Sequence, residues 1–576
     1  MARAVARRGR SLIDPSTETT RGEPSPPGPP RDGRQIRRRR AIVPGRIATP
    51  ALQAIPMVFL GVFFLWPVAA LVRRAIDVGT AGDSPVALLE RTHALHLLWV
   101  TLGQAGASTV VAAVVAAPIV WLYARLPGSG SVVLTVIVTV PFVLPTVVVG
   151  VAFRALLNGP LAGLGMGSGW PAVLAAHAFL NVAVMVRVVG AAWRSLDTRT
   201  EEAARVLGAT RTRAWWSVVA PRLAPAAGGA AALVFLFCST SFGVIIILGG
   251  GALRTLETEI YTQAIGYFRL PEAVMLSLLQ IVVVVAVLLC TRIVAPGGAS
   301  GGAGARRRPS AIAGIGWIPV VLAWAWTVLV LVGPIAVLAI RSVRPTVGGS
   351  WTLAGYRALS EPVNGVTPLD TLRYSLLSAI LAMVIALVVG GLAAITLHRS
   401  RGVAGVVGNA IAMIPLGISA VTLGFGYLIV LAALPAEIAA SPLVIPCVQA
   451  LIAIPVVIRI VIPALESVPE RLRQAAAVLG AGPWRVFRTV DLPLIGRSLG
   501  AAGGFAFVMA LGEFGATSFL ARADTTTLPV LIGSALNRPG ATELATAMAA
   551  SMVLVVVTTV AVLAVEIFRP RSGTLI

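Results

Sequence analysis

The sequence contains no lysine, so all 46 of its basic residues are arginines, against 23 acidic residues. A P-loop holds nucleotide phosphates with the lysine of a Gly-Lys-Ser/Thr sequence, so the chain has no ordinary P-loop with which to hydrolyse ATP. Schiff-base catalysis through a lysine is excluded for the same reason. No nucleophile–base–acid pattern and no metal-ligand spacing stands out either. We therefore expect no catalytic residue, no bound cofactor and no metal in this chain.

Charged residues and cysteines are also scarce. Only 12% of the residues are charged, and three are cysteines. Cys238, Cys290 and Cys447 fall within or at the ends of apolar segments, without the spacing of a disulfide framework or a metal site. We expect them to be small core residues.

Apolar sequence dominates instead, with 57% hydrophobic residues and a mean hydropathy of +0.89. A soluble domain does not need this much apolar sequence, which indicates a polytopic membrane protein. Because one helical span takes about 20 residues, the apolar segments predict an all-α fold with about twelve transmembrane helices. The predicted spans are 51–73, 98–123, 131–153, 170–190, 223–249, 272–293, 312–340, 372–397, 403–432, 443–463, 499–520 and 543–567.

The spans form two groups of six, which divides the chain into a first unit, 51–293, and a second unit, 311–568. A Gly- and Arg-rich segment, 294–310, is predicted to join them as a flexible cytoplasmic linker. Residues 1–50 are rich in Arg and Pro and lack the apolar core of a cleavable signal peptide. They predict a disordered cytoplasmic tail that sets the topology or binds anionic lipid, and 569–576 predict a second cytoplasmic tail. Because arginines gather at the span ends of one side, membrane orientation explains the net charge of +23 better than nucleic-acid binding does.

One motif occurs twice, with an offset of 272 residues between the copies. The first copy comprises Glu202, Ala203, Ala204, Gly208, Val218 and Pro221, and the second comprises Gln474, Ala475, Ala476, Gly480, Val490 and Pro493. Each copy follows the fourth span of its unit. Parallel repeats with an even number of spans place equivalent loops on the same side of the membrane. We therefore expect both loops to face the cytoplasm and a pore to run along the pseudo-two-fold axis between the units.

The residue types of the two loops predict their local structure. Segments 202–207 and 474–479 are rich in Ala, Arg and Leu, which favour a short helix. Gly208 and Gly480 can adopt a positive φ and end that helix in a sharp turn. A second short helix with an aromatic anchor would follow, before a proline marks the return to the membrane: Trp215 and Pro221 in the first copy, Trp484 and Pro493 in the second. Two helices crossed at a glycine would make a rigid knob for a partner's groove, whereas the alternative is a basic amphipathic loop on the bilayer surface.

These loop residues resemble the Glu-Ala-Ala–Gly loop of binding-protein-dependent ABC importer permeases. The fused layout resembles the ferric-iron and thiamine permeases of that family, and Ser241-Phe242-Gly243 followed by Leu248-Gly249-Gly250-Gly251 is closer to the thiamine members. The resemblance implies a permease of the bacterial inner membrane, which receives a small solute, ferric iron or thiamine, from an extracytoplasmic binding protein. It also implies two cytoplasmic ATPase subunits, which would use ATP and Mg and dock on the two loops. Membrane lipid is a further expected partner, whereas binding to nucleic acid is not expected. The second loop departs from the pattern, with Gln474 where the family usually has Glu, so we expect two unequal docking sites.

A polar solute needs polar groups along its path. Glu513 is the clearest acid within an apolar span and is a candidate contact for a cationic substrate. The competing interpretation is an interhelical hydrogen bond or an ion pair with Arg187 or Arg459. His177 and Asn181 lie on one side of the fourth span and are expected to be structural. Four hydroxyl residues are further candidates for lining the pore: Ser239, Ser241, Thr517 and Ser518.

Two other classes of protein compete with this interpretation. A secondary transporter with two six-span halves would take up its solute without an ATPase. The paired cytoplasmic loops and the scarcity of acidic residues within the spans argue against this alternative. A membrane-embedded enzyme would be expected to have an acidic or metal-binding loop on the outer side. The acids expected in outer loops, Glu257 and Glu259 among them, form no recognisable motif.

Overall fold

The computed structural model describes residues 48–80, 84–294, 316–346, 348–362, 365–399, 408, 415 and 418–568. They all belong to one compact region of the chain, residues 47–576, which contains both of the predicted units. Every regular element of this described part is a helix, and no extended strand occurs within it, which confirms the predicted all-α class. The predicted tails and linker lie almost wholly outside the described residues, although the first helix already begins at Ala48.

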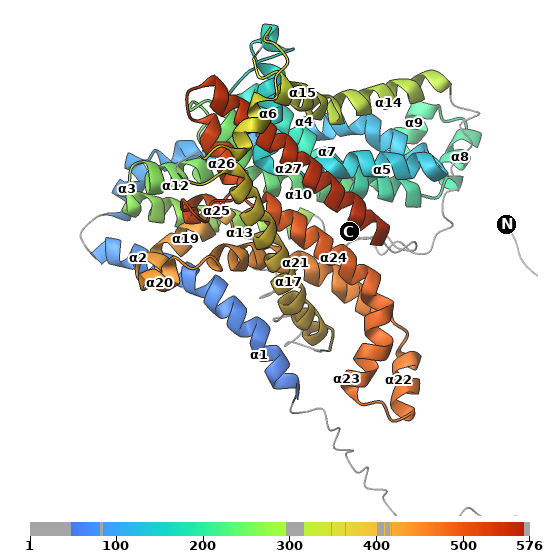
Figure 1. The fold of residues 1–576 in the computed structure, drawn as a ribbon. Helices are drawn as coiled ribbons and strands as arrows, with labels where there is room; N and C mark the ends of the chain where they lie inside the picture. Colours follow the sequence, from blue (N-terminus) through green and yellow to red (C-terminus); the bar gives the residue numbers. More distant parts are fainter. Residues whose placement is uncertain are drawn as a thin grey trace, which may run out of the picture. The chain divides into compact units, whose positions relative to one another are not determined.

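The long helices of the two units follow in the same order, except that the described part of the second unit contains no counterpart of α5 (Figure 1). The first unit contains α1 (Ala48–Leu60), α2 (Trp66–Thr80), α4 (Ala94–Arg125), α5 (Gly128–Val143), α6 (Thr146–Leu157), α7 (Trp170–Ser195), α10 (Ala220–Ser239) and α13 (Leu270–Val294). The second contains α14 (Trp317–Leu331), α15 (Gly333–Val343), α17 (Pro368–Arg399), α19 (Ala420–Ala432), α21 (Val444–Glu466), α24 (Leu492–Gly512) and α27 (Ala541–Phe568). Shorter helices between them include α3 (Pro85–Arg91), α11 (Gly243–Leu248), α12 (Leu256–Tyr261), α16 (Ala354–Arg357), α20 (Ala436–Ala439), α25 (Thr517–Leu520) and α26 (Leu528–Leu536).

The described part does not contain twelve uninterrupted spans. By length and composition, nine of its helices can cross a membrane, or up to eleven if two bent pairs each count as one span. The predicted third span is one of these pairs, because α5 and α6 meet at 100°. Its cause is local: Leu144 is extended, with ψ 139°, ahead of Pro145, and a proline disfavours the helical conformation of the residue before it. The predicted seventh span is the other pair, bent by 42° between α14 and α15, and the predicted ninth is described as a helix only from Ala420.

The predicted fifth and eleventh spans are also wrong as continuous helices. In the first unit α10 ends at Ser239 and α11 begins at Gly243. The side-chain hydroxyls of Ser239 and Thr240 both donate to the carbonyl oxygen of Leu236, at 2.9 and 3.1 Å, beside the Thr240 amide at 3.2 Å. In the second unit α24 ends at Gly512, and the next short helix, α25, begins at Thr517.

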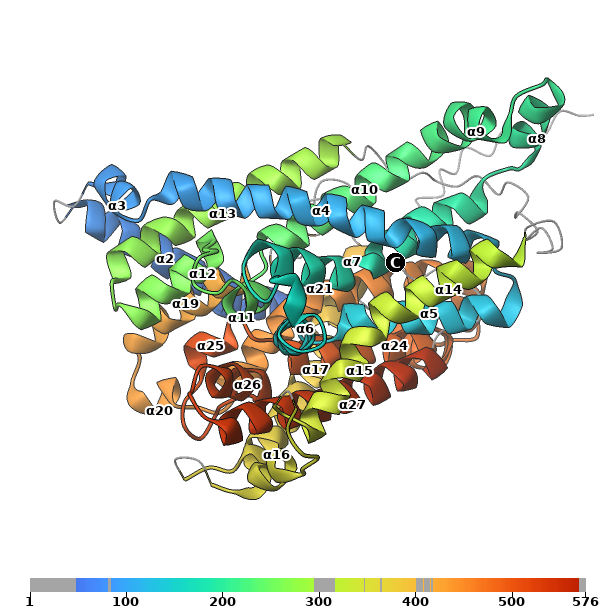
Figure 2. The same ribbon diagram turned by 90° about the horizontal axis from the view of Figure 1, so that it is seen from above.

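Reciprocal contacts relate the two units. The first helix pair of each unit crosses to the other unit: α2 packs against α19, and α15 packs against α6 (Figures 1 and 2). Likewise α1 packs against α17, and α14 packs against α4. Because α6 and α19 occupy equivalent positions in the repeat, these contacts are the two copies of one interface. Such an isologous arrangement defines a pseudo-two-fold axis between the units.

A buried hydrogen bond repeats as well. The Thr101 hydroxyl accepts from the Leu256 amide at 3.0 Å, and the Ser375 hydroxyl accepts from the Leu528 amide at 2.7 Å. In each unit the hydroxyl of the second-span helix thus satisfies a free amide at the start of a short helix, α12 or α26. The matched sequence positions therefore have matched structural roles.

The three cysteines are less uniform than predicted. Cys238 is buried and Cys447 is half-buried, but Cys290 is exposed. The exposed residue lies in the last turns of α13, so the prediction of a core position is wrong for Cys290.

Candidate functional site

Both repeated loops fold as a short helix, a glycine turn and a longer helix. In the first loop α8 (Arg199–Val206) ends ahead of Gly208, and α9 (Arg211–Ala214) follows. In the second loop α22 (Glu470–Val478) ends ahead of Gly480, and α23 (Pro483–Val486) follows. The two glycines have φ of 90° and 81°, which confirms the predicted left-handed turns.

The hydrogen bonds around the two glycines are the same. The amides of Gly208 and Ala209 donate to the carbonyl oxygens of Arg205 and Ala204, each at 3.0 Å. In the second loop the amides of Gly480 and Ala481 donate to Ala477 and Ala476, again at 3.0 Å. This pair of bonds is the Schellman motif, in which a residue of positive φ lets two amides satisfy the last carbonyls of a helix. The motif alanines Ala204 and Ala476 thus supply a backbone acceptor.

The prolines of the motif do not separate the loop from the long helix that follows it. After α9 and α23 the chain continues through five-residue π-helical turns, Trp215–Val219 and Phe487–Asp491, directly into α10 and α24. Pro221 and Pro493 lie in the first turn of those helices. A proline cannot donate to the preceding turn and its ring crowds that turn, and a π-helical turn is a common way to accommodate such a break. The second short helix is therefore the tip of a long one.

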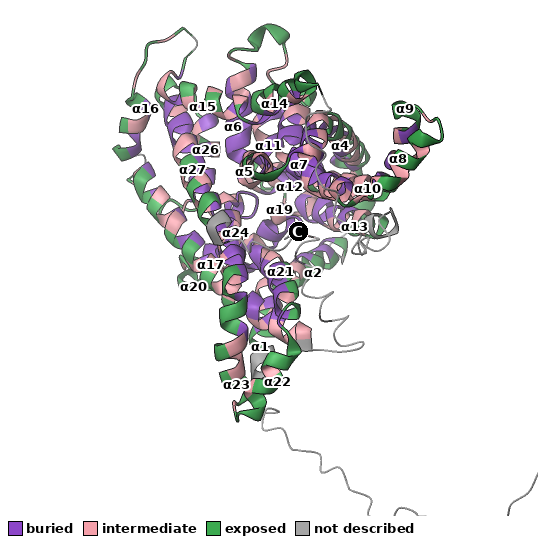
Figure 3. Cartoon of the chain, turned by 90° about the vertical axis from the view of Figure 1, so that its right-hand side faces the viewer, coloured by how far each residue is buried: buried purple, intermediate pink, exposed green. Residues whose placement is uncertain are grey.

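Both loops are largely exposed (Figure 3), and each presents an apolar Val-Leu pair. Val206 and Leu207 are each 87% exposed, and so are their equivalents Val478 and Leu479. Other motif residues on these surfaces are also exposed: Glu202, Ala203, Pro221, Gln474, Ala475, Trp484 and Pro493. Of the aromatic anchors, Trp215 is half-buried against its more exposed neighbour Trp216, with ring centroids 4.7 Å apart. An apolar patch of this kind, repeated in two copies, is typical of a protein–protein contact.

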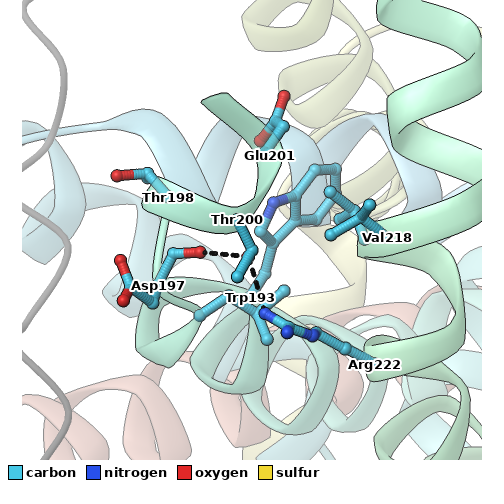
Figure 4. Close-up of a pocket in the computed structure, with 9 residues that line it drawn as sticks. Trp193, Asp197, Thr198, Thr200, Glu201, Val218 and Arg222 are labelled. Atoms are coloured by element: carbon cyan, nitrogen blue, oxygen red, sulfur yellow. Dashed lines mark hydrogen bonds between the residues drawn. The ribbon is translucent and has the colours of Figure 1, made fainter. Parts of the chain in front are cut away.

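Polar contacts tie the first loop to the long helix behind it. Arg222 of α10 donates to the Thr200 hydroxyl of α8 at 2.7 Å, and that hydroxyl donates to the carbonyl oxygen of Asp197 at 3.0 Å (Figure 4). These residues line a small pocket between the two helices, together with Trp193 and Val218. In the first loop, the contact between the two helices therefore joins the charged guanidinium of Arg222 to the neutral hydroxyl of Thr200.

The second loop is tied differently. Arg473 of α22 donates to the Asp491 carboxylate at 2.8 Å and to Glu470 at 3.1 Å, and it also donates to the carbonyl oxygen of Leu465. Partial burial disfavours the charged guanidinium, but the hydrogen bonds to Asp491 and Glu470 outweigh it and raise the pKa of Arg473. The repeat mate of Asp491 is Val219, so the first loop cannot form this ion pair. The two knobs therefore share a backbone shape but differ in their internal ties.

The candidate pore residues gather at the breaks that follow α10 and α24. Glu513 is buried, and its two carboxylate oxygens accept from the amides of Ala516 and Thr517 at 2.8 and 2.9 Å. The carboxylate thus caps α25 within its own segment, whereas we had weighed a cationic substrate against a bond to another helix or to Arg187 or Arg459. The hydroxyls of Ser239, Thr517 and Ser518 bond to carbonyl oxygens of their own segments.

Ser241 belongs to a buried polar chain in the first unit. The His177 Nε2 atom lies 2.8 Å from the Ser241 hydroxyl, and Nδ1 lies 2.9 Å from the Ser108 hydroxyl. Asn181 donates to the carbonyl oxygen of His177 at 2.9 Å. Both imidazole nitrogens are used in joining α4, α7 and the break after α10, as expected of a structural histidine.

Two acids predicted in an outer loop, Glu257 and Glu259, are instead buried in the short helix α12, where they are 0% and 5% exposed. Glu257 accepts a hydrogen bond of 2.5 Å from the Ser419 hydroxyl of the other unit. The repeat could have indicated the burial of Glu257, because its mate in the second unit is the apolar Pro529.

Two tandem helical units, related by a pseudo-two-fold axis and each carrying the same exposed knob, define a polytopic membrane transport protein. The comparisons with known proteins agree. Residues 386–573 match the family of the binding-protein-dependent transport system inner membrane component. The molybdenum transport system permease protein ModB of Mycobacterium bovis is 31% identical over 255 residues, 42% of this chain and 89% of that protein. The chain belongs to this family of permeases.

Longer matches cover both units. The thiamine transport system permease protein ThiP of Brucella abortus is 26% identical over 486 residues, 80% of this chain and 86% of that protein. ThiP of Escherichia coli is 25% identical over 528 residues, 88% of this chain and 94% of that protein. The chain is therefore the permease subunit of an ABC importer and a multi-pass protein of the inner membrane, and an ion-gradient transporter is not favoured.

Proposed function

We propose that this chain imports thiamine or a closely similar solute, which an extracytoplasmic binding protein delivers. The resemblance left ferric iron and thiamine open, and the relatives that span both units carry thiamine transport in their names. Thiamine is therefore the substrate class we propose. Both termini and the two loops face the cytoplasm in this proposal, in line with the arginines at the span ends.

Two separate ATPase subunits would drive the transport by docking on the two knobs. The observation that carries this part is the matched pair of exposed Val-Leu surfaces, held by identical glycine turns 272 residues apart. The ATPases would use ATP and Mg, while this chain would bind no cofactor and catalyse no reaction. Closure of the ATPases would move the knobs together, and rigid helices continue from each knob into α10 and α24. The moving helices end at the breaks with Ser239, Ser241, Glu513, Thr517 and Ser518, which we propose line the path of the solute.

The test replaces both turn glycines. Neither position has an atom within 4 Å of an added Cβ, so a β-branched residue there acts only through the positive φ. The left-handed conformation costs about 1–2 kcal/mol for such a residue. We expect Gly208→Val/Gly480→Val to abolish ATP-dependent uptake of labelled thiamine in proteoliposomes with binding protein and ATPase, while membrane insertion is unchanged.

Gly163→Val is the matched control, since Gly163 is exposed, lacks a positive φ and also has open space at its Cβ position. Labelled ferric iron is assayed beside thiamine. Normal thiamine uptake in the double glycine variant would overturn the coupling role of the loops. Iron uptake without thiamine uptake by the wild type would overturn the substrate class.

A further inference from the structure

Glu257 is a buried acid at the interface between the two units. Its side chain is 0% exposed in α12, where Thr255 caps the helix. One carboxylate oxygen accepts from the Ser419 hydroxyl of the second unit at 2.5 Å, and the other accepts from the Gln280 amide nitrogen at 2.8 Å. No arginine pairs with it among the ion pairs of the described residues. A buried acid inside a membrane-spanning fold is a functional-site candidate by default.

Aromatic rings from both units surround the same place. Tyr261 lies one helical turn after Glu257, so the two side chains share a face of α12. The Tyr261 ring centroid is 5.2 Å from that of Phe242 and 5.3 Å from that of Phe519. Phe242 in turn stacks on Phe514 of the other unit at 5.2 Å. We call Phe242, Tyr261, Phe514 and Phe519 the interfacial aromatic cluster.

Two buried polar atoms beside the carboxylate have no hydrogen-bond partner among the described residues. Gln280 Oε1 is one of them, and it belongs to the amide group whose nitrogen contacts Glu257. The Thr422 hydroxyl is the other, and it lies one helical turn after Ser419 at the start of α19. Both residues are 0% exposed. Unpaired polar atoms are costly to bury, so their retention beside an acid and aromatic rings points to a ligand that pairs with them in another state of the protein.

We propose that Glu257 and the interfacial aromatic cluster bind an aromatic organic cation on its way between the two units. The carboxylate would face the positive charge, the rings would lie against the heteroaromatic faces, and Gln280 and Thr422 would pair with N–H and O–H groups of the solute. In the present conformation the Ser419 hydroxyl takes the position on the carboxylate that the solute takes once the units separate. This inference rests on the proposed function, since thiamine is a cation built from two heteroaromatic rings.

The repeat makes this a single site. The mate of Glu257 is Pro529, and the mate of Gln280 is Met552, so the second unit supplies neither the acid nor the amide. Selectivity for a cation would thus come from one unit, while Ser419, Thr422 and two of the rings come from the other. One solute at a time would pass the interface.

The experiment measures ATP-dependent uptake of labelled thiamine by proteoliposomes that hold the full chain with its ATPase and binding protein. Glu257→Gln keeps the shape of the side chain but removes its charge and replaces one of its two acceptor oxygens with an N–H donor. Glu259→Gln is the control, because Glu259 lies on the same helix, is 5% exposed, and has its polar partners, Gln263 and Arg254 at 3.8 Å, in its own unit. Loss of a charge-assisted contact predicts a fall of roughly tenfold to a hundredfold for Glu257→Gln. Uptake by Glu259→Gln should stay within about twofold of the wild type.

A second pair of variants covers the case in which Glu257→Gln does not assemble. Tyr261→Leu removes a ring face while Tyr261→Phe keeps it, and we expect the larger loss of thiamine uptake for the leucine. Equal uptake by Glu257→Gln and Glu259→Gln, or an equal effect of leucine and phenylalanine, would overturn the site while wild-type uptake still supports the proposed function. Wild-type complex that takes up no thiamine would overturn the proposed function, and the site with it.

Discussion

Phe242 and Phe514 stack on each other across the interface of the two units, with ring centroids 5.2 Å apart and planes 20° apart. These residues are equivalents in the repeat, 272 positions apart. A residue that contacts its own repeat mate lies beside the pseudo-two-fold axis, because a residue far from the axis is carried away from its mate. If the solute follows that axis, the stacked rings close its path in this conformation.

We predict that Phe242→Ala/Phe514→Ala raises the passive leak of small solutes through proteoliposomes severalfold. Loss of the ring pair removes about 0.5–1.5 kcal/mol beyond the loss of buried area. Phe153→Ala is the control: Phe153 also packs against a ring, that of Phe179 at 5.5 Å, but within one unit. An equal rise of the leak in the Phe153→Ala control would contradict the prediction that the Phe242–Phe514 pair closes the path.

We predict that Arg473→Gln loosens the second knob more than Arg222→Gln loosens the first. Removal of Arg473 leaves the 5% exposed Asp491 carboxylate without its cation, which costs about 3 kcal/mol or more. Removal of Arg222 leaves only a hydroxyl, at about 1 kcal/mol. Hydrogen exchange of residues 470–491 and 199–222 measures both effects, with the exposed Arg471→Gln as the reference. Equal protection of the two loops in their variants would contradict the difference.

We predict that the repeated hydroxyl bond stabilises both units alike. Thr101→Val leaves the Leu256 amide buried without its acceptor, and Ser375→Ala does the same to Leu528. Each loss should cost about 1–3 kcal/mol and lower the melting temperature of the purified chain in detergent. Thr109→Val should have little effect, since that hydroxyl bonds only to a carbonyl of its own helix, at 2.8 Å. Equal melting temperatures for Thr101→Val and Thr109→Val would refute the stabilising role of the repeated hydrogen bond.

We predict that the exposed leucines of the knobs bind the ATPase subunits. Leu207 and Leu479 are each 87% exposed, so serine at either position should leave the stability of the isolated chain unchanged. Loss of an interface anchor typically costs about 2 kcal/mol, or roughly 30-fold in affinity. Co-purification of ATPase with each variant measures this, and Leu164→Ser, at a position 62% exposed outside the loops, is the control. Undiminished ATPase binding by the double variant Leu207→Ser/Leu479→Ser would refute the docking surface.

The sequence predicted the features that depend on local chemistry. Nine of the described apolar segments form helices long enough to cross a membrane, and Gly208 and Gly480 end α8 and α22 because few other residues tolerate a φ near 90°. The repeat at 272 residues indicated two equivalent units before any contact was known. The break at Pro145 is also predictable in principle, since proline restricts the residue before it, although the surrounding apolar run favours a continuous span.

By itself the sequence thus determined the membrane class, the duplicated units and the two knobs, because each follows from residue type and spacing along the chain. Only the tertiary structure decided which residues meet between the units. Glu257 contacts Ser419 from 162 positions away, and Phe242 reaches its own mate, because α12 and α19 pack against each other near the pseudo-two-fold axis. Burial of an acid depends on what covers it, and hydropathy along one segment carries no information about a partner from the other unit.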